Sequence, residues 1–335
     1  IDPLGLTASS TQFDSTIART ERMLRDRSLL MDTRIPTRTN DTAFIEVELV
    51  NLAGHKFPSG YPSRRAFVEL VVTDAQGDTL FRSGGWNATY EVIGHDADIE
   101  AHHDVITQEG DAQIYEMVMG DVNDDKTTVL LRAKGPLKDN RIPPLGFSSA
   151  HFAYDTTIVA GVGPADIDFN KDELGAEGAG SDVIHYHVPV SGYTGYLRAE
   201  AHVWYQSAPP RWMAEMFEHN GAEIDNFRSM YEQADGSPVL VKTASAVDLG
   251  VDVEDLKELG IRVFPNPVRD GVLRVEGITD RVRMVEVLDM RGALVAQHRA
   301  NATANWTCTL PRSGATYLLV LHTEHQRIVQ RVVYP

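Results

Sequence analysis

Two acidic loops carry oxygen-bearing side chains at the alternating spacing that calcium sites use. In the longer loop, a glutamate at the twelfth position completes the pattern, as in an EF-hand; the set is Asp166, Asp168, Asn170, Asp172 and Glu177. Lys171 stands where an EF-hand has glycine. A shorter version consists of Asp121, Asn123 and Asp125. Both loops are candidate calcium sites, and the alternative for each is a solvated turn.

The histidines offer a second metal hypothesis. His185 and His187 are two residues apart, so in a strand both rings lie on one face, as a metal-binding pair requires. The same spacing occurs in any exposed strand, which leaves a plain surface role open. His102 and His103 are adjacent and would point to opposite faces of a strand, so they cannot easily share one metal.

No set of residues predicts catalysis. The sequence lacks the G-x-S-x-G, H-E-x-x-H and P-loop patterns. Cys308 is the single cysteine, so neither an internal disulfide nor a C-x-x-C pair can form. The absence of C-x-x-C-H also means that this chain holds no covalent haem. We therefore expect a protein that is not an enzyme.

The composition excludes several further classes of protein. The formal net charge is -17, which is the wrong sign for neutralising the phosphates of a nucleic acid. Hydrophobic residues make up 42% and charged residues 24%, as in ordinary globular proteins. No apolar run approaches the roughly 18 residues that a transmembrane helix needs.

Residues 1–40 are expected to form an N-terminal helical segment. Phe13 and Ile17 recur at helical spacing, and Thr11 followed by Asp14 predicts a capping box. Pro36 is expected to end the helix, because proline lacks the amide hydrogen that a helix interior requires.

Residues 41–240 switch to the period of a β-strand. Short alternating segments separated by long polar loops predict an antiparallel β-sandwich with a few flanking helices, of which the clearest covers residues 214–234. The expected strands are Phe44–Val50, Ala66–Thr73, Asp78–Ser83, Gln113–Met119, Thr127–Ala133, Asp182–Pro189 and Tyr196–Tyr205.

The remaining residues predict a linker and a second β-domain. Residues 241–260 are acidic and weakly patterned, as a linker would be. Residues 261–335 contain short strands with Gly292 and Gly314 in the turns, which predicts a small immunoglobulin-like β-sandwich. The predicted fold class is therefore mainly β.

The C-terminal domain carries sequence blocks in a specific order: Val263–Pro267, Gly271–Val275, Val285–Gly292, Ala315–Val320 and Arg327–Val333. Together they resemble the type A C-terminal sorting domain of the type IX secretion system, with Phe264 where that family usually has tyrosine. The resemblance implies the type IX machinery as a partner and export across the outer membrane to the cell surface or beyond. The alternative is a generic immunoglobulin-like appendage.

The central region carries a second resemblance. Its strongest block is Asn51–Arg65, and later blocks follow in order at Tyr115–Asn123, Leu137–Pro144 and Tyr205–Arg211. They resemble the C-terminal β-domain of multihaem c-type cytochromes. In that family the haem-binding motifs precede this region. The resemblance therefore implies a multihaem cytochrome segment or subunit as the partner of this chain.

The cytochrome resemblance gives three residues a specific meaning. His55 would be an axial ligand to a haem held by a neighbouring segment or chain, because imidazole ligates iron without covalent attachment. Arg64 and Arg65 would bind haem propionates as bidentate donors. The alternatives are a loop histidine bonded to the backbone and two plain surface arginines.

These inferences combine into one expected function. The chain is expected to be an exported, non-catalytic scaffold or accessory part of an extracellular multihaem cytochrome assembly that transfers electrons. The alternative is a surface adhesion or carbohydrate-binding β-sandwich protein without a haem partner, because fold analogy alone does not separate the two.

Overall fold

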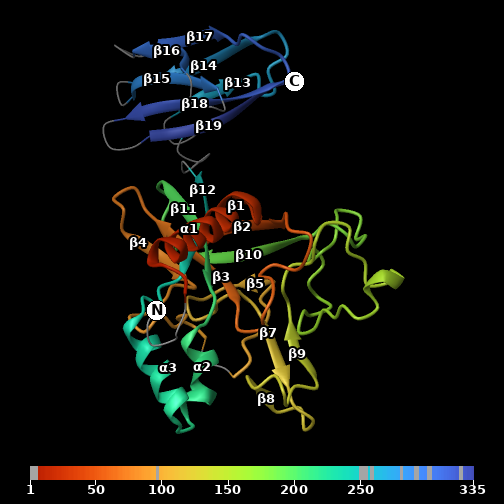
Figure 1. The fold of residues 1–335 in the computed structure, drawn as a ribbon. Helices are drawn as coiled ribbons and strands as arrows, with labels where there is room; N and C mark the ends of the chain where they lie inside the picture. The colour runs from red at the N-terminus through yellow and green to blue at the C-terminus, as the bar shows by residue number, and fades with distance from the viewer. Residues whose placement is uncertain are drawn as a thin grey trace. The chain divides into compact units, whose positions relative to one another are not determined.

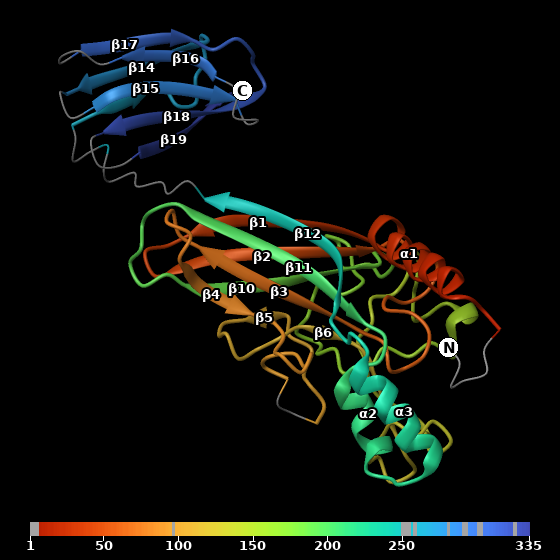
Figure 2. The same cartoon turned by 60° about the vertical axis from the view of Figure 1, so that its left-hand side comes forward.

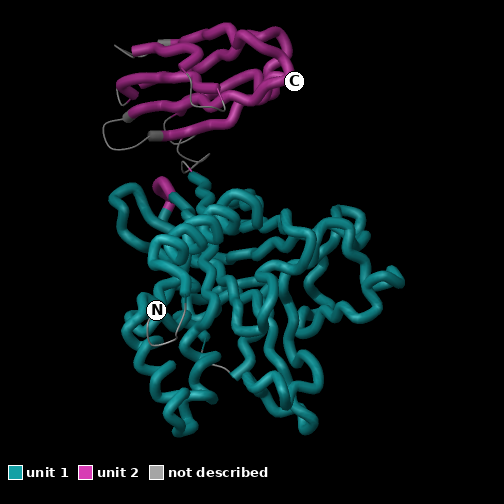
Figure 3. The backbone as a smooth tube through the Cα atoms, viewed as in Figure 1, with its two compact units in different colours: residues 1–193, 198–247 teal, residues 194–197, 248–335 magenta. Residues whose placement is uncertain are grey.

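The computed structural model describes residues 7–95, 98–248, 256, 260–279, 282–289, 294–299, 304–323 and 327–335. The fold is mainly β and built from several antiparallel sheets, which confirms the predicted fold class. The chain divides into two compact units, one of residues 1–193 and 198–247 and the other of residues 194–197 and 248–335 (Figure 3). None of the described helices is both long and apolar enough to cross a membrane.

The first sheet of unit 1 has the strand order β1-β2-β10-β5. Its strands are β1 (Leu29–Arg38), β2 (Thr42–Asn51), β10 (Ser181–Pro189) and β5 (Val105–Ile106). Along β2, every second side chain is buried, from Ala43 to Asn51, and the intervening ones are partly exposed. This alternation places one face of the sheet in the core of a β-sandwich.

The second sheet of unit 1 has the order β12-β11-β3-β4, with β6 also paired to β3 (Figure 2). Its strands are β12 (Val239–Asp248), β11 (Leu197–Gln206), β3 (Arg65–Thr73), β4 (Thr79–Ser83) and β6 (Ile114–Tyr115). Residues 65–70 of β3 are all buried, because this strand is covered on both faces.

A small third sheet has the order β8-β7-β9. It is formed by β8 (Lys126–Thr127), β7 (Met117–Gly120) and β9 (Gly135–Asp139). The predicted strand Thr127–Ala133 is wrong beyond Thr127. There the backbone amide of Thr128 donates to Glu215 of a helix at 2.6 Å, so the chain leaves the strand path and turns.

The N-terminal helix α1 (Ser10–Arg27) is shorter than expected. Its capping box is made by Ser9 and Gln12, which precede the expected pair by two residues. Pro36 does not end this helix but lies in β1, where the pairing with β2 shifts register between Arg34 and Thr37. An edge strand tolerates proline at such an irregularity. Residues 29–38 of the expected helical segment are therefore strand.

Two helices replace the single one expected over residues 214–234. They are α2 (Pro210–Phe217) and α3 (Ala222–Gln233), with Gly221 between them, and a one-turn helix, η2, covers Phe152–Tyr154. The expected linker begins inside β12, which runs to Asp248. Of the rest of that segment, only Leu256 and Gly260 are described.

Unit 2 is a sandwich of a three-stranded sheet, β13-β14-β17, and a four-stranded sheet, β16-β15-β18-β19. Its strands are β13 (Arg262–Phe264), β14 (Val272–Ile278), β15 (Val282–Asp289), β16 (Leu294–Arg299), β17 (Ala304–Thr309), β18 (Ala315–Thr323) and β19 (Arg327–Tyr334). Strands β13 and β17 were not expected from the sequence. The core includes Leu273, Val285 and Leu319, all inaccessible to solvent. The turn assigned to Gly292 lies outside the described residues.

The turn after β4 requires glycine for two reasons. Gly84 has a φ of +69°, and a Cβ atom there would lie 2.0 Å from the carbonyl oxygen of Val68 in the neighbouring strand. Gly77, in the turn before β4, has a φ of +89° with nothing within 4 Å. Substitution of Gly77 would therefore introduce backbone strain alone, whereas substitution of Gly84 would add steric overlap.

Gly84→Ala is expected to lower the free energy of unfolding by about 2–4 kcal/mol, because strain at positive φ adds to overpacking. Gly77→Ala should cost only about 1–2 kcal/mol, since it has the strain alone. Urea denaturation of both variants measures the difference. Equal losses would contradict the close approach of Gly84 to β3.

Candidate functional site

A cavity in unit 1 has a volume of about 650 Å³. Its wall combines the loop after β2, strand β7, and the chain that follows β9. Met117, Met119 and Phe147 supply apolar surface, and the polar groups come from His55, Lys56, Asp139 and Arg141. Cavities of this size with mostly apolar walls and a few convergent polar groups are typical of ligand or cofactor sites.

Asn51, at the end of β2, fixes the loop that carries His55. Its side-chain amide nitrogen lies 2.8 Å from the carbonyl oxygen of His55, 3.0 Å from that of Ile142 and 3.1 Å from that of Pro143. Asn51 is inaccessible to solvent. This one side chain therefore joins the His55 loop to the segment after β9.

Beneath the loop, a buried ion cluster lines the cavity. Lys56 donates to Asp139 at 2.8 Å and also to the carbonyl oxygen of Ile158. Arg141 binds the same carboxylate in a bidentate manner, at 2.7 and 2.9 Å. Burial lowers the pKa of Lys56, and the Asp139 charge opposes that shift. Two cationic groups share one carboxylate, so this wall carries an excess of positive charge.

His55 itself is exposed at the edge of the cavity. Its Nδ1 atom lies 3.3 Å from the carbonyl oxygen of Lys56. Within the described part of the chain, Nε2 makes no hydrogen bond. A ring bonded through Nδ1 leaves Nε2 as the nitrogen that could act as an axial ligand to iron.

The two arginines differ from each other in the structure. Arg64 is half-buried and donates to the carbonyl oxygen of Ser59, at the rim of the cavity, at 3.0 Å. Arg65 is 1% exposed, and it binds Gln206 at 2.8 Å and Glu91 at 2.7 Å. A propionate contact by Arg65 would therefore have to compete with these core partners of its guanidinium.

Glu91 depends on this arginine. Burial opposes its ionisation, but the hydrogen bond with His95 and the charge of Arg65 lower its pKa to about 2. In this ion pair Arg65 is buried and Glu91 is partly exposed, so removal of Glu91 would leave the charge of Arg65 uncompensated in the core.

In the longer acidic loop, the side chains predicted to bind calcium contact other partners. Asp166 accepts from His102 at 2.7 Å, whereas Asp168 lies 3.0 Å from Nε2 of His185. Their neighbour Asn170 has a φ of +58°, and its buried side chain bonds Phe147 and Gly180 of the backbone. The alternate side chains therefore diverge toward different partners.

The last two predicted ligands are also engaged elsewhere. One carboxylate oxygen of Asp172 accepts from the backbone amides of Leu174 and Ala176, each at 2.9 Å, and so closes its own turn. Glu177 accepts from the backbone amide of Ser149 at 2.7 Å. The spacing is that of a calcium loop, but local backbone bonding is the competing use of these oxygens.

The shorter loop is a turn between β7 and β8. Asp121 accepts from the backbone amides of Asn123, at 2.7 Å, and Asp125, at 3.1 Å. Asp124 adopts a φ of +64° at the tip. This geometry matches the alternative reading, a solvated turn closed by an aspartate side chain.

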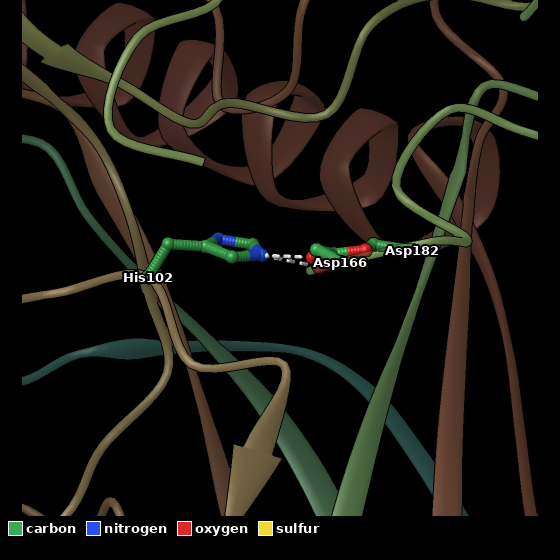
Figure 4. Close-up of side chains that lie close together, drawn as sticks. All are labelled: His102, Asp166 and Asp182. Atoms are coloured by element: carbon green, nitrogen blue, oxygen red, sulfur yellow. Dashed lines mark hydrogen bonds and ion pairs between the residues drawn. The ribbon is translucent and has the colours of Figure 1, made fainter. Parts of the chain in front are cut away.

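The structure instead forms two groups that each contain one histidine and two aspartates. The buried group is His102, Asp166 and Asp182 (Figure 4). The half-buried group is Asp104, Asp168 and His185. His187 joins neither group, because its ring packs edge-on against Phe44 at 4.8 Å.

In the buried group, the protonation of His102 is fixed by its surroundings. The amide nitrogens of Gln113 and Asn140 lie 2.8 and 3.0 Å from Nδ1. The side-chain oxygen of Asn140 accepts from the Glu116 amide, and its nitrogen donates to the Ile114 carbonyl. Exchanging the oxygen and nitrogen of this side chain would lose both hydrogen bonds. Nδ1 must therefore accept, and Nε2 carries the proton that it donates to Asp166.

A neutral His102 leaves two buried carboxylates close together. Tyr115 donates to one oxygen of Asp182 at 2.6 Å, and the other oxygen has no hydrogen-bond partner in the described chain. Burial raises the pKa of Asp182 to about 6, and the charges of Asp166 and Asp168 act in the same direction.

The half-buried group has its own electrostatic pattern. The hydrogen bond with Asp168 raises the pKa of His185. Burial, aided by the charge of Asp166, raises the pKa of Asp104. Both directions are those expected where carboxylates outnumber cations.

Sequence reasoning missed the cationic wall of the cavity. Lys56 and Arg141 are charged residues in segments that become buried, and Asp139 ends a strand beside them. The available signal was the block Leu137–Pro144, whose charged residues have no place in a buried segment unless they pair with one another.

Comparison with known proteins adds little to this geometry. No protein family matches the sequence, and no curated protein does. Among solved structures, a penta-heme cytochrome c552 from Thermochromatium tepidum is similar to 68% of the chain, at 17% identity and a TM-score of 0.41. The chain spans 41% of that cytochrome's length.

Two further solved structures are similar over most of the chain. HBP35 of Porphyromonas gingivalis is 9% identical, with a TM-score of 0.21 over 92% of this chain and 63% of its own. The BSP domain of a biofilm associated protein is 7% identical, with a TM-score of 0.22 over 96% and 55%. All three TM-scores are low, so function must be inferred from the site itself.

Asp182 should make the free energy of unfolding depend on pH. Its pKa rises from 3.8 to about 6 on folding, so the folded state binds the extra proton. Stability should therefore fall by roughly 3 kcal/mol as the pH rises from about 4 to above 6. Asp182→Asn should remove that loss, as urea denaturation near pH 5 and pH 8 can measure.

Asp166→Asn is the matched comparison. Burial opposes ionisation of Asp166, but bonds from His102 and the Phe169 amide lower its pKa. Its removal should thus destabilise the protein at both pH values. An unchanged pH dependence in Asp182→Asn would contradict the assignment of the proton to Asp182.

Proposed function

We propose that this chain is an exported, non-catalytic accessory protein that contacts a haem held by a multihaem cytochrome segment or subunit. The observation that supports this proposal is the placement of His55 at the edge of a cavity whose wall carries Lys56, Asp139 and Arg141. Imidazole nitrogen, apolar surface and excess positive charge are the three features that the exposed edge of a haem would require.

Each part of the cavity has a distinct role in this proposal. Nε2 of His55 would ligate the iron, since imidazole nitrogen is a common axial ligand. The partly exposed side chains of Met117 and Met119 would pack against the porphyrin. The carboxylate of a propionate would approach Lys56 and Arg141, which share the buried carboxylate of Asp139.

Residues 261–335 would serve export in the same proposal. Their two-sheet sandwich and their sequence blocks support a type IX sorting domain, which would place the cavity outside the cell. Deletion of these residues in a bacterium with that secretion system should retain the protein inside the cell envelope, as fractionation and immunoblotting can measure. Equal secretion of the shortened chain would contradict the sorting role.

The haem contact can be tested with a haem c undecapeptide, a proteolytic fragment of cytochrome c whose sixth iron position is open. Adding the full chain should convert the ferric peptide from high spin to low spin, with a red shift of the Soret band. His55→Ala should abolish the conversion, because the imidazole that ligates iron is gone. Lys56→Met should weaken binding by about tenfold, the effect of losing about 1.4 kcal/mol from a charge-assisted contact.

His219→Ala is the matched control, because His219 is another exposed histidine, in the turn between α2 and α3. It should leave the titration unchanged. The absence of any spectral change with the intact chain, or the same change with His55→Ala, would overturn the proposed haem contact.

A further inference from the structure

The half-buried group around β10 has the geometry of a metal site. Nε2 of His185 lies 3.0 Å from one oxygen of Asp168 and 4.0 Å from one of Asp104. Metal bonds of about 2.0–2.2 Å in tetrahedral geometry separate their ligand atoms by roughly 3.4 Å. The two separations observed bracket that value, so small side-chain shifts would complete the three-ligand set.

The strands bring these ligands together from distant parts of the chain. Asp104 precedes β5, which pairs with β10 in parallel at His185 opposite Val105. The backbone amide of His185 donates to the carbonyl oxygen of Asp104 at 2.9 Å. Asp168 comes from the loop that leads into β10. Backbone pairing thus fixes two of the three ligands before any ion binds.

The other side of the His185 ring faces a carboxylate. Its Nδ1 atom lies 3.7 Å from Glu46 on β2, the residue paired with His185 across the sheet. Glu46 is itself held by Arg34 of β1 at 2.5 Å. Without a metal, Nε2 donates its proton to Asp168, and a metal would take the place of that proton. The Glu46 carboxylate beside Nδ1 would then favour the proton on Nδ1, as outer partners of zinc-bound histidines do.

A separate observation concerns the second carboxylate oxygen of Asp168. This oxygen, Oδ1, is inaccessible to solvent and has no hydrogen-bond partner within the described chain. Leaving a buried charged acceptor without a partner is costly. A cation bound at the carboxylate of Asp168 would offset this cost and the charges of Asp104 and Asp168, because it would interact with the whole carboxylate group.

The buried group of His102, Asp166 and Asp182 has the same residue types but cannot bind a metal in the same way. Gln113 and Asn140 both donate to Nδ1 of His102, so its Nε2 carries a proton and faces Asp166 as a donor. A metal at Nε2 would need that proton to move to Nδ1, against two amide donors.

We propose that Asp104, Asp168 and His185 form a binding site for a divalent cation of the zinc type, with Glu46 as the positioning residue that sets the tautomer of His185. One imidazole and two carboxylates are ligands that zinc accepts, and a fourth position remains for water. All three side chains are 26–31% exposed, which allows an ion to reach them from solvent. None of the three lines the cavity of His55.

The test is titration of the chelator-treated full chain with Zn²⁺ by calorimetry, and with Co²⁺ by absorption spectroscopy. We expect one strong site per chain and visible Co²⁺ bands of the intensity typical of four-coordination. His185→Gln and Asp168→Asn should each abolish that site. Glu46→Gln should weaken it by about 10–100-fold, the effect of removing an outer partner of a metal-bound histidine.

Two variants serve as matched controls. His187→Gln changes the neighbouring histidine on the same face of β10, and Asp182→Asn changes the buried group; both should bind Zn²⁺ as the parent does. Melting curves establish that each variant is folded, and Asp104→Asn provides a third ligand variant should either of the others unfold. No strong site in the parent, or a strong site retained in His185→Gln, would overturn the proposal.

Discussion

Buried charge is the constraint on which this fold depends most. Lys56, Asp139 and Arg141 are each less than 9% exposed, and a charge in such a place must be matched by a partner. Pairing of Lys56 with Asp139 holds the loop after β2 against the end of β9. Asn51 then fastens the same two segments through backbone carbonyls. These contacts between the two segments form the cavity wall and determine the position of His55.

The same constraint explains why Arg65 and the two histidine-aspartate groups are built as they are. Arg65 can enter the core only because Glu91 and Gln206 accept from it there. The two groups each gather more carboxylates than cations, and they relieve the imbalance differently. The buried group does so by holding a proton, whereas the half-buried one lies open to an ion from solvent.

Much of the fold was predictable from periodicity. Strand β2 alternates along its whole length, and β10 and β11 begin and end within a residue or two of their expected bounds. The errors occur where a tertiary contact overrides the local preference of the sequence. Pro36 reads as a helix end, yet the edge of a sheet accommodates it. Residues 128–133 have the pattern of a strand, but the backbone amide of Thr128 donates to Glu215 and the chain turns there.

The site was predictable only in part, for a physical reason. Spacing identifies residues that can reach one ligand when they share a loop or a strand face, and it favoured the calcium set. It gives no information about pairing between Asp168 and His185, 17 residues apart, or between Lys56 and Asp139, 83 residues apart. Those contacts exist only once the sheets have formed. The spacing therefore predicted that Asp166 and Asp168 bind one ion, whereas in the structure they contact two different histidines.

The irregular edge formed by β1 has a consequence for how copies of this chain meet. An unpaired strand edge is a template on which another chain can add a strand. β1 lies at the edge of its sheet, and Pro36 withholds a donor where the register with β2 breaks. The charged side chains of Asp32 and Arg34 stand on the same strand. At high local density, neighbouring copies should therefore remain separate rather than fuse into a continuous intermolecular sheet.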